Sequence, residues 1–180
     1  MHRAAIFVVA LLSLASACAQ TVFPDVSTLT TDAAAAYDAK DWNAAVRLYR
    51  QIVERSPQPR AWFRLGVALR NAGNPDEAIA AFERGIRSGM APYQGEYGIA
   101  TVHATQKNPE AAFTWLQRAV EHGYNTPEAL KSEPSLAVLT SDPRFAAIVE
   151  RATMNQRPCA HRAENRQFDF WVGDWDVVTA

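Results

Sequence analysis

The sequence predicts an all-α protein in which helices form pairs and the pairs stack side by side. Three stretches repeat at nearly equal intervals, and Ala45, Ala78 and Ala112 hold one shared position in them. Alanine is abundant and only 8 of the 180 residues are glycine, a composition that favours helices. A period of about 34 residues has room for two helices and their turns. Because one pair cannot bury a core alone, we expect the pairs to stack.

The overall charge argues against a nucleic-acid partner. The formal net charge is −1, whereas binding to phosphates requires clustered Lys and Arg side chains. Apolar residues make up 48% of the chain, which is enough to build a buried core. The composition therefore indicates a folded domain rather than a disordered or nucleic-acid-binding segment.

Residues 1–19 have the layout of a secretory signal peptide: a short basic start, an apolar run over residues 4–14, and small residues after it. The apolar run is too short to span a bilayer. Cleavage after the small residues would leave Gln20 as the first residue of a periplasmic or secreted protein. Alternatively, the segment before Cys18 resembles a bacterial lipobox, and lipidation of Cys18 would anchor the protein to a membrane. Simple cleavage is the preferred prediction, since Ala15 stands where a lipobox usually has leucine.

Two helix starts are marked by an asparagine followed by a proline, at Asn74-Pro75 and one repeat later at Asn108-Pro109. Such an asparagine can cap the helix, and proline fits the first turn, where its missing amide hydrogen is not needed. The apolar periodicity between signals of this kind predicts six helices. Their expected spans are 27–39, 42–55, 59–72, 75–88, 93–106 and 109–122.

The second helix pair resembles the tetratricopeptide repeat. The residues at consensus places of that repeat are Trp62, Leu65, Gly66, Gly73, Ala78 and Phe82. In the other two repeats, Ala33 and Ala100 stand in place of the glycine of the first helix. We expect small residues where paired helices approach closely. The resemblance implies a right-handed α-solenoid of about three helix pairs, and the alternative is an unrelated alanine-rich helical bundle.

A capping segment is expected after the third pair, since the open end of a stack needs cover. Thr126-Pro127 and Asp142-Pro143 each combine a capping residue with a first-turn proline. The apolar side chains of this segment are Leu130, Leu136, Leu139, Phe145, Ile148 and Val149. We expect short helices that close the solenoid, so that the repeats and their cap together span residues 27–153.

The resemblance also implies a binding groove, because the first helix of each tetratricopeptide pair lines the concave face. The groove residues that it assigns are Tyr37, Arg60, Phe63, Val67, Arg70, Asn71, Gln94, Tyr97 and Thr101. Helical geometry independently places the five residues between 60 and 71 on one face. Aromatic rings flanked by Arg60 and Arg70 suit an extended partner polypeptide with a carboxylate. The alternative is a solvated face with partly packed aromatic residues.

Some members of the family clamp a chaperone's terminal carboxylate, and that clamp does not carry over. Thr30, Ala34 and Val67 occupy places where the clamp needs polar or cationic side chains, and the groove of the third repeat has no Lys or Arg. We therefore expect an exported scaffold that binds a protein or peptide partner by other contacts.

Groups that could support catalysis or bind a metal are few. His103 is expected in or beside the core, and His122 at a helix C-terminus, where its positive charge is favoured. Cys159 and His161 are two possible metal ligands, too few for a zinc site. The sequence predicts no enzyme activity, no metal site and no cofactor.

The C-terminal residues differ from the rest of the chain. Residues 154–165 are polar without a period and indicate a linker. Apolar and polar residues alternate from Asp174 to Thr179, which predicts a short strand-like tail. Residues 166–177 resemble the opening of a lipocalin-like β-barrel domain of exported bacterial proteins, so we expect residues 166–180 to begin a β domain. The alternative function follows: an accessory helical domain of a larger secreted protein whose β-barrel binds a ligand or carries enzymatic activity.

Overall fold

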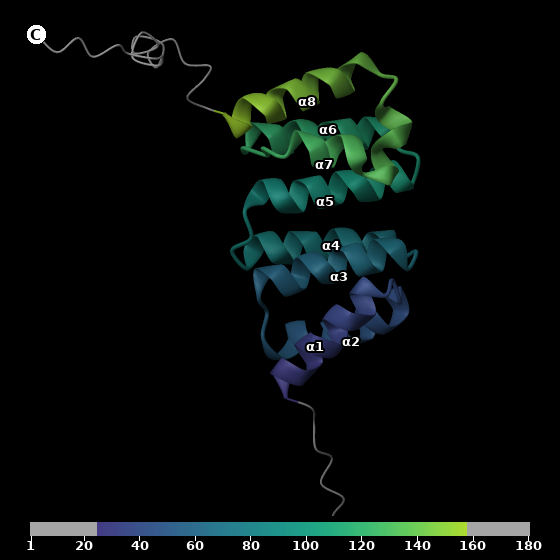
Figure 1. Cartoon of the computed structure of the whole chain (residues 1–180), viewed down its shortest axis with the longest axis vertical. Coiled ribbons are helices and arrows are strands. Elements are labelled where there is room, and N and C mark those ends of the chain that lie inside the picture. Colours follow the sequence, from purple (N-terminus) through teal and green to yellow (C-terminus); the bar gives the residue numbers. More distant parts are fainter. Residues whose placement is uncertain (1–24, 158–180) are drawn as a thin grey trace, which may run out of the picture.

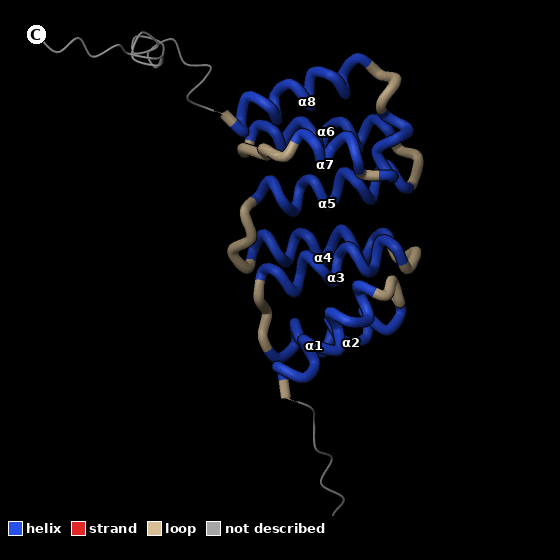
Figure 2. Tube along the Cα trace, in the orientation of Figure 1, coloured by secondary structure: helices blue, strands red, loops and turns tan. Residues whose placement is uncertain are grey.

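The computed structural model describes residues 25–157, and every element of secondary structure in that range is helical (Figures 1 and 2). The elements are α1 (Val26–Asp38), α2 (Trp42–Arg55), α3 (Pro59–Asn71), α4 (Pro75–Arg87), α5 (Pro92–Thr105), α6 (Pro109–Glu121), α7 (Pro127–Ser132), the 3-10 helix η1 (Pro134–Leu139) and α8 (Pro143–Gln156). The six predicted helices agree with α1 to α6 to within one residue at each end. The predicted all-α solenoid is confirmed, while its strand-like tail lies outside the described residues.

The helix pairs stack along the long axis of the molecule, from α1 and α2 at one end to α8 at the other (Figure 1). From α1 to α6 each helix packs against the next one in the chain, α3 also touches α5, and α8 packs on α6 and α7. The resemblance to the tetratricopeptide repeat assigns α1, α3 and α5 to the concave face of this stack and α2, α4 and α6 to the convex face. No helix in the described range is long and apolar enough to cross a bilayer.

A single aromatic ring fills the centre of the stack. Phe82 of α4 is completely buried, and its ring lies between Gly66 of α3 and Gly98 of α5. A Cβ atom added at Gly66 would meet the ring at 2.7 Å, and one at Gly98 would meet it at 2.5 Å. The small residue expected at position 66 is therefore required by a ring from the neighbouring helix, which is a more specific reason than close approach of two helices.

The predicted capping residues are correct in two of four places. The side-chain oxygens of Asn108 and Asp142 accept hydrogen bonds from backbone N–H groups in the first turns of α6 and α8. The prediction is wrong for Asn74 and Thr126, whose side chains make no capping hydrogen bond. The Asn74 side-chain amide instead donates to the carbonyl of Ala72 at 3.5 Å. Because each of these helices starts with proline, one fewer N–H group needs a capping partner there.

The capping segment has the layout of a fourth, interrupted helix pair. Pro75, Pro109 and Pro143 begin α4, α6 and α8 at equal intervals, so α8 holds the place of a second helix. The first helix of this pair starts as α7 but ends at Ser132, just before Pro134, and continues as η1. Proline inside a helix removes a hydrogen bond and clashes with the preceding turn, which explains the break. The redirected η1 packs against α5, and we call Glu133–Leu139 the strap.

Helix α8 continues through Gln156, past the predicted boundary at residue 153. Its last turn is tied to the preceding helices, because the side-chain amide of Asn155 donates to the carbonyls of Val120 and Tyr124 at 2.7 and 2.9 Å. Residues 154–156 are thus helical rather than part of a linker. The predicted signal peptide with Cys18, the rest of the linker with Cys159 and His161, and the β-domain start at 166–180 lie outside the described residues.

Candidate binding groove

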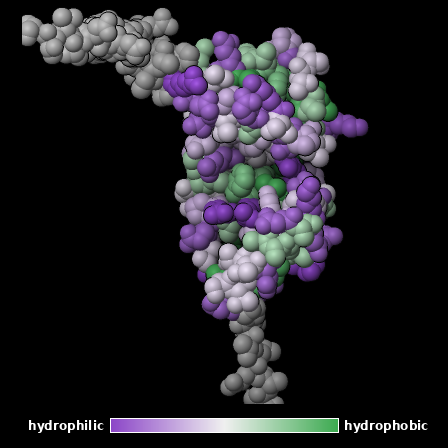
Figure 3. Space-filling view, viewed as in Figure 1, coloured by the Kyte–Doolittle hydropathy of each residue, from purple (hydrophilic) through white to green (hydrophobic). Residues whose placement is uncertain are grey.

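Two hollows lie next to each other on the concave face. The first, with a volume of about 700 Å³, is enclosed by α3, α5, the turn between α1 and α2, and the strap; we call it the strap hollow. The second, of about 660 Å³, is enclosed by the N-terminal halves of α3 and α5 and by the turns before α5 and α7; we call it the tyrosine hollow. Phe63 and Tyr97 line both hollows and form the ridge between them. Figure 3 shows hydrophobic residues gathered in a depression between α3 and α5, with hydrophilic residues around it.

The strap hollow is mainly apolar. Trp42 and Val67 form one wall, and Val138 of the strap forms part of the opposite wall with 60% of its surface exposed. Val138 is the one large hydrophobic residue in the described range that is so exposed, although the neighbouring Leu136 and Leu139 are buried in the core. The strap is therefore anchored by its leucines and presents a valine to the hollow.

Arg70 in the strap hollow already has an anionic partner. Its Nη1 atom lies 3.4 Å from Oε1 of Glu133, and the two side chains are 12% and 19% exposed. Glu133 also accepts a hydrogen bond from the Ser135 hydroxyl at 2.8 Å, which holds the carboxylate in place. Arg70 was predicted to bind a carboxylate of the partner. This prediction is corrected, because Arg70 is already paired with the carboxylate of Glu133 in the strap.

The tyrosine hollow has aromatic walls. The rings of Tyr97 and Tyr124 stack with centroids 4.8 Å apart, and Tyr93 meets Tyr124 edge to face at 6.2 Å. Burial raises the pKa of the Tyr97 and Tyr124 phenols above the ordinary tyrosine value, so both rings stay neutral through the physiological range. The one charged residue among the described residues that line this hollow is Arg60, which is exposed.

All nine predicted groove residues line one of the two hollows, and the structure divides them by accessibility. Arg60, Asn71 and Gln94 are exposed, whereas Tyr37, Phe63, Val67, Arg70 and Tyr97 are half-buried. Thr101 is 1% exposed, and its hydroxyl donates to the carbonyl of Gly98 at 2.6 Å. Thr101 can therefore form the floor of the strap hollow but has no free hydroxyl for a partner. Phe63 packs on Phe82 with centroids 5.6 Å apart, as the alternative of a solvated face with partly packed aromatic residues also expects.

Sequence reasoning missed the residues that reach the groove from outside the first helices. Tyr124 and the strap come from the capping segment, and Trp42 comes from the start of α2. The repeat interval that leads from Pro109 to Pro143 was the available signal, because it places residues 127–139 where a fourth first helix would line the groove. Nothing in the sequence indicated that Pro134 would turn this segment onto α5.

The two histidines of the third pair are in structural positions. His122 follows the end of α6, as predicted, and its Nδ1 lies 2.7 Å from the Glu96 carboxylate. Glu96 is buried and also pairs with Arg118 at 3.3 Å, so it ties α5 to α6. His103 is half-buried, as predicted, and its Nδ1 has no hydrogen-bond partner among the described residues. Across residues 25–157 no three His, Cys, Asp or Glu side chains gather as potential metal ligands.

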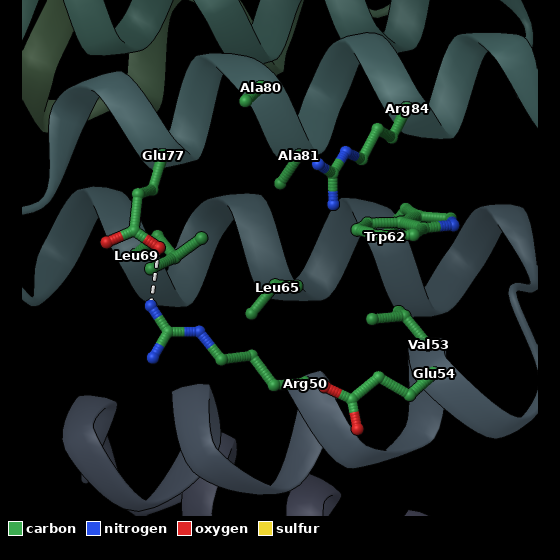
Figure 4. Close-up of a pocket in the computed structure, with 10 residues that line it drawn as sticks. All are labelled: Arg50, Val53, Glu54, Trp62, Leu65, Leu69, Glu77, Ala80, Ala81 and Arg84. Atoms are coloured by element: carbon green, nitrogen blue, oxygen red, sulfur yellow. Dashed lines mark hydrogen bonds and ion pairs between the residues drawn. The ribbon is translucent and has the colours of Figure 1, made fainter.

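A third hollow, of about 480 Å³, lies between α2, α3 and α4, away from the groove residues (Figure 4). Two of its arginines have partners in the chain. Arg50 pairs with Glu77, as the dashed line in Figure 4 marks, and the Arg84 guanidinium lies 5.5 Å from the centre of the Trp62 ring. The concave face is the better candidate site, because it combines two adjoining hollows with aromatic walls, and Arg60 there forms no ion pair with any residue in the described range.

The sequence model of the tetratricopeptide repeat matches residues 31–95 and 71–129, which together exceed half of the chain. The chain belongs to the tetratricopeptide repeat family. Over 78 residues it is 31% identical to mouse tetratricopeptide repeat protein 21B, a stretch that covers 43% of this chain and 6% of that protein. The chain thus spans a small part of the length of this relative.

Solved structures of tetratricopeptide repeat proteins share the fold. MamA MSR-1 C2 is 26% identical with a TM-score of 0.51, covering 54% of this chain and 57% of that chain. The Yersinia enterocolitica type III secretion chaperone SycD, in complex with a peptide of the translocator YopD, is 16% identical with a TM-score of 0.51 over 73% of this chain and 95% of that chain. The TPR2B domain of yeast Sti1, in a pHsp70 complex, is 18% identical with a TM-score of 0.51 over 72% and 96%.

Proposed function

We propose that this tetratricopeptide repeat protein is an exported interaction scaffold whose concave groove binds a segment of a partner polypeptide. The observation that carries the proposal is the pair of adjoining aromatic hollows on the concave face, separated by Phe63 and Tyr97. Adjoining apolar pockets with exposed amide side chains at their edges suit an extended chain, because side chains can fill the pockets while the amides bind its backbone. Asn71 and Gln94 supply such amides.

Two of the structural relatives support a polypeptide ligand. SycD is solved with a peptide of YopD, and the TPR2B domain of Sti1 with pHsp70. We infer that the present chain uses its groove in the same general way, with different residues. No catalytic step is proposed for it, since the family mainly supplies binding surfaces.

The proposal is tested by photo-crosslinking in the native host. A crosslinking amino acid is placed at Gln94 or Asn71 in the groove, and at Arg47, which is exposed on the convex helix α2 and lines neither hollow. We expect one polypeptide to be crosslinked from both groove positions and absent from the Arg47 control. A partner that is captured from position 47 alone would refute the groove as the binding site.

Export is part of the proposal and rests on the signal-peptide layout of residues 1–19. Intact-mass measurement on protein from the native host separates the possibilities. A chain that starts at Gln20 supports a periplasmic or secreted protein, and a diacylglyceryl group on Cys18 indicates a membrane-anchored lipoprotein. A retained Met1 in a cytosolic fraction would contradict export.

A second candidate function is that of an accessory helical domain in a larger secreted protein. Residues 166–177 favour it, because their aromatic and acidic pattern resembles the start of a lipocalin-like β-barrel. Sequencing of the gene beyond codon 180 tests this candidate. A continuing frame with alternating strands would assign ligand binding or enzymatic activity to the barrel, and a stop codon would exclude it.

A further inference from the structure

The two hollows of the groove differ in charge. In the strap hollow the Arg70 guanidinium is paired with Glu133, and the groups still exposed on its walls are mainly apolar. In the tyrosine hollow no acidic residue is present among the described lining residues, and Arg60 has no ionic partner in the described range. Two cations of the groove have no ion pair in the described range, Lys107 in the strap hollow and Arg60 in the tyrosine hollow, and of these Arg60 lies beside the tyrosines.

The walls of the tyrosine hollow suit an aromatic or long aliphatic side chain. Tyr93, Tyr97 and Tyr124 present ring faces and edges, and Met90 closes the bottom with 4% of its surface exposed. Aromatic pairs in such arrangements gain stability beyond that of the buried area alone. Methionine adapts to irregular apolar shapes and makes favourable contacts with aromatic rings.

Contacts within the chain hold in place the wall of the hollow that Tyr124 forms. Tyr124 sits in the turn between α6 and α7, and the side-chain amide of Asn155 holds that turn through the carbonyls of Val120 and Tyr124. The Tyr124 ring is stacked on Tyr97 and is buried. The protein therefore loses little conformational entropy at this wall when a ligand binds, which favours specific binding.

Resting on the proposed function of the groove, we propose that the tyrosine hollow recognises a partner segment in which an aromatic or long aliphatic side chain stands next to Asp or Glu. The apolar side chain enters the hollow and packs on the half-buried rings of Tyr93 and Tyr97, and the carboxylate pairs with the Arg60 guanidinium at the edge. The exposed amide of Gln94 lies on the same lining and can bind the backbone of the segment. Because Glu133 of the strap already pairs with Arg70, the carboxylate of the partner binds Arg60 instead.

The test begins with a display library of random twelve-residue peptides selected on the immobilised full chain. We expect the enriched peptides to share an aromatic or long aliphatic residue within two positions of Asp or Glu. One enriched peptide, labelled with fluorescein, is then titrated with the unmodified protein and with three single variants. Arg60→Glu reverses the charge of the hollow, Arg47→Glu makes the same change on the convex face, and Val138→Glu places a charge in the strap hollow.

Arg60→Glu is expected to lower the affinity for the peptide by about tenfold or more, as for a charged anchor residue. Arg47→Glu is expected to leave this affinity unchanged. Arg60 is exposed and without ionic partners in the described range, so its substitution leaves the fold intact. Peptides that lack an acidic residue, or that bind Arg60→Glu normally, would overturn the inference. If those peptides are still weakened by Val138→Glu, the groove remains the binding site and only the partner chemistry is wrong. If neither variant weakens them, the proposed function of the groove fails as well, and a library without binders overturns both.

Discussion

The confinement of Phe82 between two glycines gives a sharp prediction for Gly66→Ala. The new Cβ atom would lie 2.7 to 2.9 Å from three atoms of the Phe82 ring. The ring cannot move away, because it is fully buried and Gly98 of α5 closes the opposite side. Overpacking of this kind costs about 1–3 kcal/mol, whereas replacing a helical glycine by alanine gains about 1 kcal/mol.

Three close ring contacts place the overpacking cost in the upper part of its range, so we expect Gly66→Ala to lower the free energy of unfolding by up to about 2 kcal/mol. Chemical denaturation followed by circular dichroism measures it. The control is a double-mutant cycle with Phe82→Leu, which removes the ring atoms that clash. The cost of Gly66→Ala should fall by about 1 kcal/mol in the Phe82→Leu background. A stabilising Gly66→Ala, or strictly additive effects in the cycle, would show that the ring is not confined as described.

Three further predictions concern the end of the solenoid. Arg144 binds Glu110 and Asp142 and lowers the pKa of both carboxyls, so their ion pairs stabilise the fold above the ordinary carboxyl pKa and are lost as the pH falls through the lowered values. Arg144→Gln should raise both pKa values in an NMR titration and make the loss of stability in acid less steep; unchanged titration curves would contradict this. Asn155→Ala removes the side-chain donor from the Tyr124 carbonyl and from the Val120 carbonyl, which keeps a bond from the Gly123 N–H, and should cost about 1–3 kcal/mol of unfolding free energy in urea denaturation; a neutral effect would mean that the turn is held by other contacts. Burial raises the pKa of Tyr124, so its neutral phenol favours the fold below the ordinary tyrosine pKa and this contribution falls as the pH rises further. Because burial also raises the pKa of Tyr37 and Tyr97, ultraviolet titration should show a late step that loses the amplitude of one tyrosine in Tyr124→Phe, and an unchanged late amplitude would refute the prediction.

The regular part of the fold could be predicted because its signals are local. Helix starts follow from first-turn prolines such as Pro75 and Pro109, and the repeat period sets the pairing. Asn74 shows the limit of this reasoning, since its residue type suits a cap but its side chain bonds elsewhere. A capping bond depends on side-chain rotation, and sequence alone does not fix that.

The predicted groove residues all line one of the two hollows, but their accessibility could not be predicted. Arg70 and Glu133 are far apart in the sequence and meet only because Pro134 turns the strap onto α5. Thr101 was assigned by its place in the helix, and the strap and its own hydrogen bond to Gly98 leave it buried. Tyr124 went unnoticed since it lies in a turn, where apolar periodicity gives no signal.

The interrupted fourth pair also limits how the repeat number of this protein can change through gene duplication. A copied helix pair inserted between α4 and α5 would meet complete helix pairs on both sides. A copy appended after α8 would instead have to stack on α7 and η1, whose first helix is cut short at Ser132. We therefore expect homologues with longer or shorter arrays to differ upstream of the strap and to retain Pro134, so that the tyrosine hollow is inherited as the fixed end of an array of variable length.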